Sequence, residues 1–437
     1  MNTVDFIREI FGLLNREVPY VVLRNYEGLP DNNKSRDIDF AIEKKDFLKV
    51  QPELVKLIHN CGWKIVTYLR SNRLITFVCG QVNEDNSVDL LQLDFFYNTS
   101  VFGIELIGSD EMVKHRQWNG FLYHTDKAHE FLDKYLYNRA VGAQYPEKYR
   151  ATREAAAEDP EVKRVLREVF GMKSVEACDK ASKKTLLLNA LKYNFRKHKL
   201  GAIGRFLNFE RWHLRNYIKG DTGFSIGFTG PDGAGKTTVI DTMIEDLGDV
   251  FRKAHVYHHF RPMLFGNISD VAHSAGIKKT VDKNYSDPHR GGKTNALSSL
   301  LRLAYYSVDY ILGFFPKVKA NTRITRLVIF DRYFTDIVCD SRRTRIYLPY
   351  KWLYRYGRWF IPQLDYNILL TASVETILGR KRELDRAGID AINERISFLE
   401  GKRGYYRVEN EGTAAEAAAN ILRIVFAEQD RRIASKF

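Results

Sequence analysis

The stretch FTGPDGAGKTTVID, residues 228–241, constrains the fold of this chain more than any other part of it. Gly230 and Gly235 have four residues between them and are followed by Lys236 and Thr237, the spacing of a loop that wraps phosphate groups. An apolar run precedes the motif and an apolar stripe at helical spacing follows it, which predicts a strand, a tight loop and a helix. A purely structural glycine turn is the alternative.

The motif gives each side chain of the loop an expected role. Lys236 is expected to reach the β and γ phosphates of ATP, and Thr237 to offer its hydroxyl to Mg²⁺. The other residues expected to bind the nucleotide are Gly230, Gly233, Ala234, Gly235 and Thr238. Asp232 lies beside the expected γ phosphate, where it is a candidate base or a partner for an acceptor hydroxyl. A turn-forming role is its alternative.

A second acidic element follows another apolar run in RLVIFDRYFTD, residues 326–336. Asp331 is a candidate for orienting Mg²⁺ or its water, and Arg332 for holding a phosphate of the acceptor. A charged pair at a strand end, without a ligand, is the alternative.

Four β-like runs, FSIGFTG, AHVYHHF, RLVIFD and YNILL, alternate with helical stretches after residue 224. This alternation is typical of a doubly wound α/β fold, with a parallel sheet covered by helices on both faces. The most apolar window, residues 300–315, contains Arg302 and Asp309 and is shorter than a membrane span. It is predicted to form a buried helix.

Together, GPDGAGKTT, FDRY and GRKRELDRAG (379–388) resemble the thymidylate kinase family of P-loop kinases over residues 222–437. The resemblance implies a P-loop kinase that uses ATP and Mg²⁺, with Asp331 and Arg332 binding the acceptor. It also implies a mobile lid, whose candidate arginines are Arg380, Arg382 and Arg386. The expected catalytic residues are Lys236, Asp232, Arg332, Arg382 and Arg386. A solvated helix face is the alternative for the lid.

The segment VYHHFRP, residues 256–262, departs from the Arg-Glu-Pro signature that this family has at the corresponding place. Arg261 remains a candidate acceptor contact, while His258 and His259 indicate a different acceptor surface or are polar residues of the core. A sugar or glycan acceptor therefore competes with a nucleoside monophosphate. The fusion to an amino-terminal domain resembles enzymes of bacterial surface polysaccharide synthesis. The Asn-Lys-x-Asp motif of GTP-binding proteins is absent from the sequence, which favours ATP.

Residues 1–135 are predicted to form a small α/β domain with an opening helix and five β-rich runs between residues 20 and 96. Asp37 and Asp39 project from one face of a strand, and Asp94 on another run could complete a three-carboxylate metal site. Asp89 is the alternative third acid. Residues 18–100 resemble the nucleotidyltransferase superfamily, with Arg24 and Asn25 where its Gly-Ser turn is expected. A solvated pair of aspartates is the alternative.

Residues 136–220 form a predicted helical connector that carries 19 Lys and Arg against 9 Asp and Glu. Such a segment favours acidic partners, and 201–220 could lie on a membrane surface, although packing against the next domain is the alternative. No nucleic acid is expected as a partner. The four cysteines stand far apart, which indicates neither a zinc site nor a disulfide scaffold. The amino terminus lacks a signal-peptide pattern, and a cytoplasmic protein is expected.

The sequence therefore predicts three segments, namely a nucleotidyltransferase-like domain (1–135), a basic helical connector (136–220) and a thymidylate kinase-like domain (221–437). The leading hypothesis is a kinase for a nucleoside monophosphate or a sugar or glycan acceptor. One alternative is a bifunctional kinase and nucleotidyltransferase. Another is a nucleotide-gated scaffold that binds an acidic glycan or a membrane.

Overall fold

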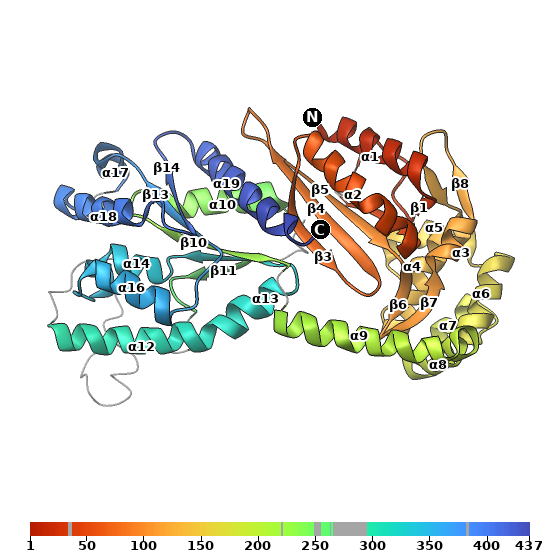
Figure 1. Ribbon diagram of the computed structural model, residues 1–437. Coiled ribbons are helices and arrows are strands. Elements are labelled where there is room, and N and C mark those ends of the chain that lie inside the picture. The colour runs from red at the N-terminus through yellow and green to blue at the C-terminus, as the bar shows by residue number, and fades with distance from the viewer. Residues whose placement is uncertain (34–36, 220–221, 249–254, 263, 265–294, 382–383) are drawn as a thin grey trace. The chain divides into compact units, whose positions relative to one another are not determined.

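Figure 1 shows a computed structural model of the chain, which describes residues 1–33, 37–219, 222–248, 255–262, 264, 295–381 and 384–437. Its internal contacts divide the chain into two compact units. Unit 1 comprises Met1–Gln81, Asp89–Ile218 and Gln429–Phe437, and unit 2 comprises Val82–Val88 and Lys219–Glu428. Each unit has its own sheet and its own buried core.

Unit 1 is built on a seven-stranded mixed sheet with the strand order β3-β4-β5-β2-β1-β9-β8. The strands are β1 (Tyr20–Val22), β2 (Asp37–Ile42), β3 (Lys64–Arg70), β4 (Leu74–Val82), β5 (Val88–Phe96), β8 (Arg116–Trp118) and β9 (Tyr123–Thr125). Strands β2 and β5 run parallel, whereas β1 and β2 run antiparallel. A separate hairpin joins β6 (Asn98–Val101) and β7 (Ile104–Gly108). The five predicted β-rich runs are confirmed as strands of the sheet.

Helices α1 (Thr3–Glu17) and α2 (Lys44–Asn60) bury their apolar sides in one core of unit 1. Phe6 of α1 stacks on Trp63 with ring centroids 4.3 Å apart, and Phe47 of α2 lies 4.7 Å from Phe95 of β5. Burying such large rings supplies much of the free energy that holds helices on a sheet. The predicted opening helix is confirmed.

A second buried core of unit 1 lies between several helices and the strands β1, β2, β6 and β7. Its helices are α3 (Ser109–Lys114), α4 (Lys127–Val141), α5 (Arg150–Ala156), α6 (Pro160–Phe170), α7 (Val175–Lys180) and α8 (Lys183–His198). The chain continues into α9 (Leu200–Lys219). Asp126 caps α4 by accepting a hydrogen bond from the backbone N–H of His129, and Gly142 ends the helix with a φ of 82°. The helical character predicted for residues 136–220 is confirmed.

Unit 2 is built on a five-stranded parallel sheet with the order β11-β12-β10-β13-β14. The strands are β10 (Phe224–Thr229), β11 (Val256–His259), β12 (Leu327–Asp331), β13 (Tyr366–Thr371) and β14 (Tyr405–Glu409). The first four were predicted from their apolar runs and are confirmed. The fifth, YYRVE, lies at the sheet edge and alternates buried with more exposed residues, so it shows no continuous apolar run.

Helices lie on both faces of this parallel sheet, with α10 (Lys236–Leu247) and α19 (Ala414–Ala434) on one and α12 (Ala296–Phe314), α14 (Phe334–Cys339) and α16 (Tyr350–Phe360) on the other (Figure 1). Further helices of the unit are α13 (Ala320–Thr322), α15 (Ser341–Thr344), α17 (Val374–Arg380) and α18 (Arg386–Leu399). A parallel sheet needs both faces covered because its strands are apolar on each side. Unit 2 is therefore a mixed α/β structure with a covered parallel sheet.

The apolar window at residues 300–315, predicted to be a buried helix, forms most of α12 and is buried on one side only. Leu303 and Tyr310 lie in the core, whereas Leu301 and Leu312 are 65% and 53% exposed. The prediction of a buried helix is thus corrected, because the helix forms but is buried on one side only. Among the described residues, no helix combines the length and the apolar character needed to cross a bilayer.

Candidate functional site

The glycine-rich loop, residues 230–235, follows β10, the central strand of the parallel sheet. The order of the chain reverses at this strand, because β12 lies on one side of it and β13 on the other. In open α/β sheets such a reversal leaves a crevice beyond the carboxyl ends of the strands, where ligands bind. The loop leads directly into α10, so the unpaired N–H groups and positive end of that helix lie at the same place.

Two glycines allow the loop to lie against the sheet. Gly235 has a φ of 85°, and a side chain there would put its Cβ 2.5 Å from the amide nitrogen of Asn410. A Cβ on Gly230 would lie 2.1 Å from the carbonyl oxygen of Leu370 in β13. Asn410 in turn donates a hydrogen bond of 2.8 Å to the Ala234 carbonyl. Any side chain at either glycine would therefore displace the loop.

Lys236 is the first residue of α10, and its ammonium group points back at the loop. Its Nζ donates to the carbonyl oxygens of Gly230 and Pro231 at 2.8 and 2.9 Å, and lies 4.0 Å from Asp232 Oδ1. Burial, assisted by the charge of Arg332, lowers the pKa of Lys236 to about 8. The ammonium is thus held mainly by neutral carbonyl dipoles, and an anionic ligand would be a stronger partner.

Asp232 joins the loop to two arginines from elsewhere in unit 2. Its Oδ1 accepts a hydrogen bond from Arg332, and its Oδ2 accepts one from Arg343. Arg332 also donates to Asp336 Oδ1 at 2.8 Å and is almost fully buried. Burial alone would lower the pKa of Arg332, but the carboxylates of Asp336 and Asp232 raise it above its ordinary value. The predicted residues Asp232, Lys236 and Arg332 therefore meet in one cluster, together with Arg343.

The backbone of Arg332 has a φ of 80°, a left-handed conformation that is strained for a residue with a long side chain. Its N–H donates to the Phe228 carbonyl of β10 at 3.0 Å. Strain of this kind costs about 1–3 kcal/mol and concentrates at functional sites. The strained backbone places the guanidinium group of Arg332 beside the loop.

Asp331 is the last residue of β12, as predicted. Its Oδ2 accepts a hydrogen bond of 3.2 Å from the Tyr257 hydroxyl and lies 3.5 Å from His259 Nδ1. Its Oδ1 is buried and has no hydrogen-bond partner among the described residues. Burial would raise the pKa of Asp331, but His259 and the charges of Lys236 and Arg332 hold it below the ordinary value. The carboxylate is therefore ionised at neutral pH and has one oxygen available for a cation or water.

Arg261, predicted to contact an acceptor, is buried in unit 2 with 1% of its side chain exposed. It donates to Asp309 Oδ2 at 2.7 Å, and Asp309 Oδ1 accepts from the Leu264 N–H at 2.7 Å. The rings of Tyr305 and Tyr306 lie 5.7 and 5.3 Å from its guanidinium carbon. These contacts join the segment after β11 to α12.

The three arginines expected in a lid have different settings. Arg380 ends α17 and donates to the Asn410 carbonyl at 2.9 Å, next to the loop. Arg386 forms an ion pair of 2.5 Å with Glu375, in which both side chains are mostly exposed. Arg382 lies outside the described residues.

In unit 1, the predicted acids Asp37, Asp39 and Asp94 lie on neighbouring parallel strands. Asp39 of β2 is the register partner of Asp94 of β5, and Asp37 is that of Gln92. Asp94 accepts hydrogen bonds from Gln92, at 2.8 Å, and from Thr76. Burial raises the pKa of Asp39 to about 7, against the opposing charge of Arg24.

Arg24 stands where the nucleotidyltransferase superfamily has its Gly-Ser turn, and its guanidinium group lies between two carboxylates. The distances are 2.7 Å to Asp39 Oδ2 and 2.9 Å to Asp133 Oδ2. Thr99 also donates a hydrogen bond to Asp133. The acid cluster of unit 1 is therefore already paired with a cation of its own chain.

Sequence reasoning missed Arg343, Asn410 and Asp133. Arg343 lies in DSRRTR (340–345), and this basic run shortly after the Asp331-Arg332 pair was a usable signal. Asn410 follows β14, the edge strand that has no apolar run. Asp133 lies inside α4, where nothing in the local sequence indicates that it meets Arg24.

Comparison with known proteins adds little to this geometry. No protein-family profile matches the sequence, and no curated protein matches it. Among solved structures, thymidylate kinase from Ehrlichia chaffeensis is similar at 13% identity with a TM-score of 0.31. That alignment covers 46% of this chain and 98% of that one. The residues of the site itself therefore carry the evidence for function.

Proposed function

We propose that unit 2 is an ATP- and Mg²⁺-dependent phosphotransferase of the P-loop type that transfers the γ-phosphoryl group to a nucleoside monophosphate or a sugar or glycan acceptor. The observation that carries the proposal is the buried ammonium group of Lys236, which two loop carbonyls hold at the start of α10. A triphosphate in the loop would replace those carbonyls as its partner. The N–H groups of Gly233, Ala234 and Gly235, with Thr238 beside them, would bind the same phosphates.

The residues at this site also suit Mg²⁺, which prefers oxygen ligands. Thr237 is exposed on the first turn of α10, and the buried Asp331 Oδ1 has no hydrogen-bond partner among the described residues. Thr237 and Asp331 would hold the ion or its water shell. When bound, Mg²⁺ neutralises charge on the phosphoryl group in transfer.

Phosphoryl transfer needs positive charge around three equatorial oxygens more than it needs covalent chemistry. Arg332 and Arg343 bring two guanidinium groups to Asp232, directly beside the loop. In the proposed reaction Arg332 holds the acceptor, and Asp232 orients its hydroxyl or takes its proton. Arg380, Arg382 and Arg386 would approach the donor phosphates from a lid.

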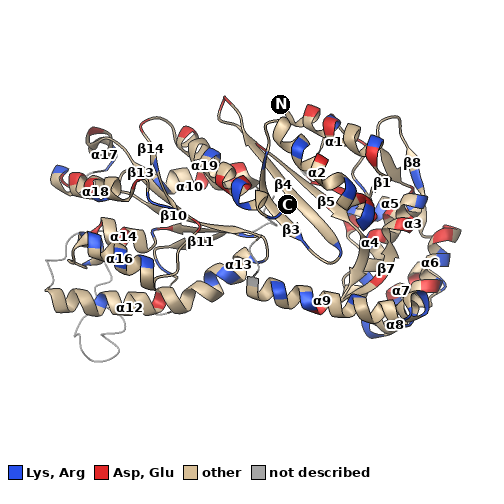
Figure 2. Cartoon of the chain, in the orientation of Figure 1, with Lys and Arg blue, Asp and Glu red and all other residues tan. Residues whose placement is uncertain are grey.

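The acceptor is proposed from the surface at the end of β11. His259 is 65% exposed and lies near Asp331, whereas Arg261 is buried in an ion pair with Asp309. This polar, exposed edge suits hydroxyl groups of a sugar as well as a phosphate. A sugar or glycan acceptor would make the protein an enzyme of surface polysaccharide synthesis in the cytoplasm. In Figure 2 the ribbons of α8 and α9 are blue at their Lys and Arg residues, and these helices are proposed to contact an anionic membrane or glycan.

A second candidate function is nucleotidyl transfer by unit 1, and the register pairing of Asp39 with Asp94 favours it. Arg24 would have to leave Asp39 before a metal ion could bind there. Pyrophosphate release from a nucleoside triphosphate, lost on Asp37→Ala with Asp39→Ala while ADP release persists, would establish this activity. If wild-type protein releases no pyrophosphate from any nucleoside triphosphate, the second candidate is wrong.

The kinase proposal is tested by mass spectrometry of products formed from ATP and Mg²⁺ with a panel of nucleoside monophosphates, sugars and sugar phosphates. We expect one acceptor to gain 80 Da, about the mass of a phosphoryl group, with matching ADP. Lys236→Ala should reduce turnover roughly 10²–10³-fold, the usual effect of losing one charge-stabilising donor. Lys351→Ala, at an exposed position of α16, is the matched control. Full turnover by Lys236→Ala, or ADP release that no acceptor accelerates, would contradict the proposal.

A further inference from the structure

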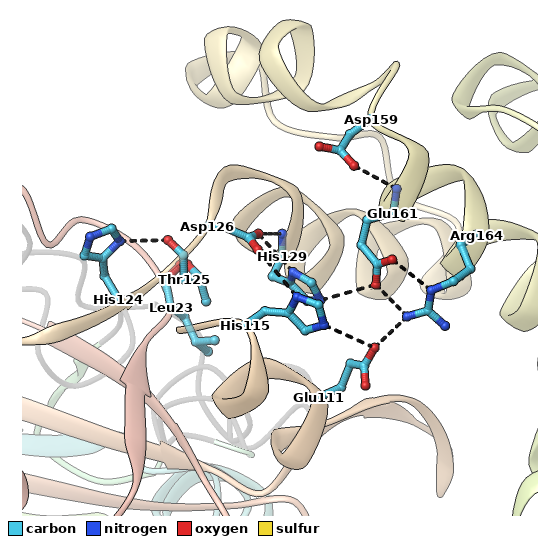
Figure 3. A network of polar contacts seen from close by, with 10 residues as sticks. All are labelled: Leu23, Glu111, His115, His124, Thr125, Asp126, His129, Asp159, Glu161 and Arg164. Carbon is cyan, nitrogen blue, oxygen red and sulfur yellow. Dashed lines mark hydrogen bonds and ion pairs between the residues drawn. The ribbon is translucent and has the colours of Figure 1, made fainter. Parts of the chain in front are cut away.

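Four side chains from neighbouring helices of unit 1 converge in one cluster (Figure 3). Glu111 lies in α3 and His115 directly follows that helix, one turn further along, while His129 lies in α4 and Glu161 in α6. Each offers one ligand atom, and these atoms all lie within 4.8 Å of one another. Two imidazoles and two carboxylates are a donor set that zinc and related divalent transition metals accept.

His129 gives the strongest indication of a ligand. Its side chain is fully buried, its Nδ1 lies 2.9 Å from Asp126 Oδ1, and its Nε2 has no hydrogen-bond partner among the described residues. Because an ionised carboxylate only accepts hydrogen bonds, Asp126 favours the proton on Nδ1 and leaves the lone pair on Nε2. Burial would raise the pKa of Asp126, but the hydrogen bonds from His129 hold it below its ordinary value. A metal-binding histidine commonly has such a carboxylate on its other nitrogen.

The free Nε2 of His129 points into the cluster. It lies 3.8 Å from Glu161 Oε1, which is too far for a hydrogen bond. With the proton on Nδ1, both Nε2 and this carboxylate oxygen are acceptors. A buried lone pair that faces a carboxylate oxygen is unfavourable unless a cation lies between them. A metal ion between the two atoms would satisfy both of them.

His115 completes the imidazole pair. Its ring stacks on that of His129 with centroids 4.3 Å apart and planes inclined by 22°. Its Nε2 lies 3.9 Å from Glu111 Oε1, and its Nδ1 lies 3.9 Å from Asp126 Oδ2. The stack therefore holds two imidazoles, the commonest metal ligands in proteins, beside each other.

Arg164 is the competitor for the same carboxylates. Its guanidinium group contacts Glu111 Oε1 at 2.6 Å and Glu161 at 2.5 Å, and it also pairs with Glu168 at 2.9 Å. Arg164 is 43% exposed, so it can turn to solvent and Glu168 and leave both carboxylates to a metal ion.

We propose that Glu111, His115, His129 and Glu161 form a binding site for a divalent transition metal ion, with Zn²⁺ as the representative probe. Four protein ligands and a buried histidine are typical of a structural site rather than a catalytic one. The ion would join α3, α4 and α6. The binding energy would therefore stabilise unit 1.

The test uses the full-length chain without a histidine tag, stripped of metal with a chelator. Zn²⁺ is titrated by calorimetry, and Co²⁺ by the visible absorption of a tetrahedral ion. We expect one ion per chain and a higher thermal midpoint with Zn²⁺. His115→Asn, whose native side chain is 30% exposed and not deeply buried, should weaken binding at least about tenfold. His213→Asn, at an exposed position of α9, is the matched control and should bind normally.

Two further variants separate a metal site from a network of ion pairs. Asp126→Asn keeps a good helix cap but loses the charge behind His129, so it should weaken Zn²⁺ binding about 10–100-fold. Arg164→Gln removes the competing cation and should strengthen binding, whereas a purely ionic network would only lose stability. Circular dichroism verifies that each variant is folded. A wild-type chain that takes up neither ion, or a folded His115→Asn that binds both as tightly as wild type, would overturn the proposal.

Discussion

Lys236 in unit 2 is a buried cation and Arg24 in unit 1 is a mostly buried one, 18% exposed, and they are held in opposite ways. Lys236 is bonded to two neutral carbonyl oxygens at 2.8 and 2.9 Å, and burial lowers its pKa to about 8. Arg24 lies between the carboxylates of Asp39 and Asp133 at 2.7 and 2.9 Å, and their charges raise its pKa above the ordinary value despite burial.

The difference shows which of the two cations would gain more from binding an anion. A cation held by dipoles gains when a phosphate replaces them, because charge-assisted hydrogen bonds are the stronger ones. A cation held by two buried carboxylates cannot turn to a ligand without leaving both charges unpaired. The position of Lys236 therefore suits an anion better than the acid cluster of unit 1, where Asp39 is already paired with Arg24.

The largest effect is expected from Arg24→Ala. The substitution leaves Asp39 and Asp133 without their cation in a buried place, which should lower the free energy of unfolding by about 3–5 kcal/mol. Urea denaturation monitored by circular dichroism measures it. Arg16→Ala, in an exposed ion pair with Glu17, is the control and should change stability by less than about 0.5 kcal/mol. A loss as small as that of the control would remove the contrast between the two cations.

Gly235→Ala should weaken nucleotide binding with a smaller change in stability. The new Cβ would meet the Asn410 amide in a backbone conformation that is strained for alanine, at about 1–3 kcal/mol, or roughly 5–150-fold in affinity. Calorimetry with a non-hydrolysable ATP analogue measures the change. Gly379→Ala in α17 is the matched control, because no atom lies within 4 Å of its new Cβ. Equal binding by the two variants would mean that the loop does not hold the phosphates.

The pKa of Lys236 predicts the pH dependence of binding. Above about pH 8 the free protein loses the proton from Lys236, so binding a triphosphate must restore it, and affinity should fall roughly tenfold per pH unit toward pH 9–10. In the same range the free energy of unfolding should rise with pH through this group, because the unfolded chain holds a proton on Lys236 that the native one lacks. Calorimetry in two buffers of different ionisation enthalpy reports the proton uptake. Lys236→Met should abolish the dependence, and affinity that is constant from pH 7 to 9 in the wild type would contradict the assignment.

The smallest change in stability is expected from Arg386→Ala. The side chains of Arg386 and Glu375 are 63% and 70% exposed, and exposed ion pairs contribute at most about 1 kcal/mol. Thermal unfolding should therefore be nearly unchanged. Turnover of ATP separates the two interpretations of this helix, since a lid residue would lower kcat whereas a solvated helix face would leave it unchanged. Arg358→Ala in α16 provides a comparable surface substitution.

The strands that have continuous apolar runs and the glycine-rich loop could be predicted from the sequence alone. Residues 224–247 fold as the predicted strand, loop and helix, because apolar runs, glycines and the helical stripe act on their immediate neighbours. The same holds for Asp331 at the end of β12. Residues that are neighbours along the chain determine where a strand ends, and therefore which residues lie at that end.

The contact partners of these groups are set by tertiary packing and could not be predicted from the sequence. Arg343 meets Asp232 from 111 positions away, Arg24 meets Asp133 across 109, and His129 meets residues of two other helices. The cysteine pattern gave no sign of a metal site, because the candidate ligands are histidines and glutamates from separate segments. Side chains this far apart are brought together by the packing of whole helices and strands, and no local pattern in the chain records that packing.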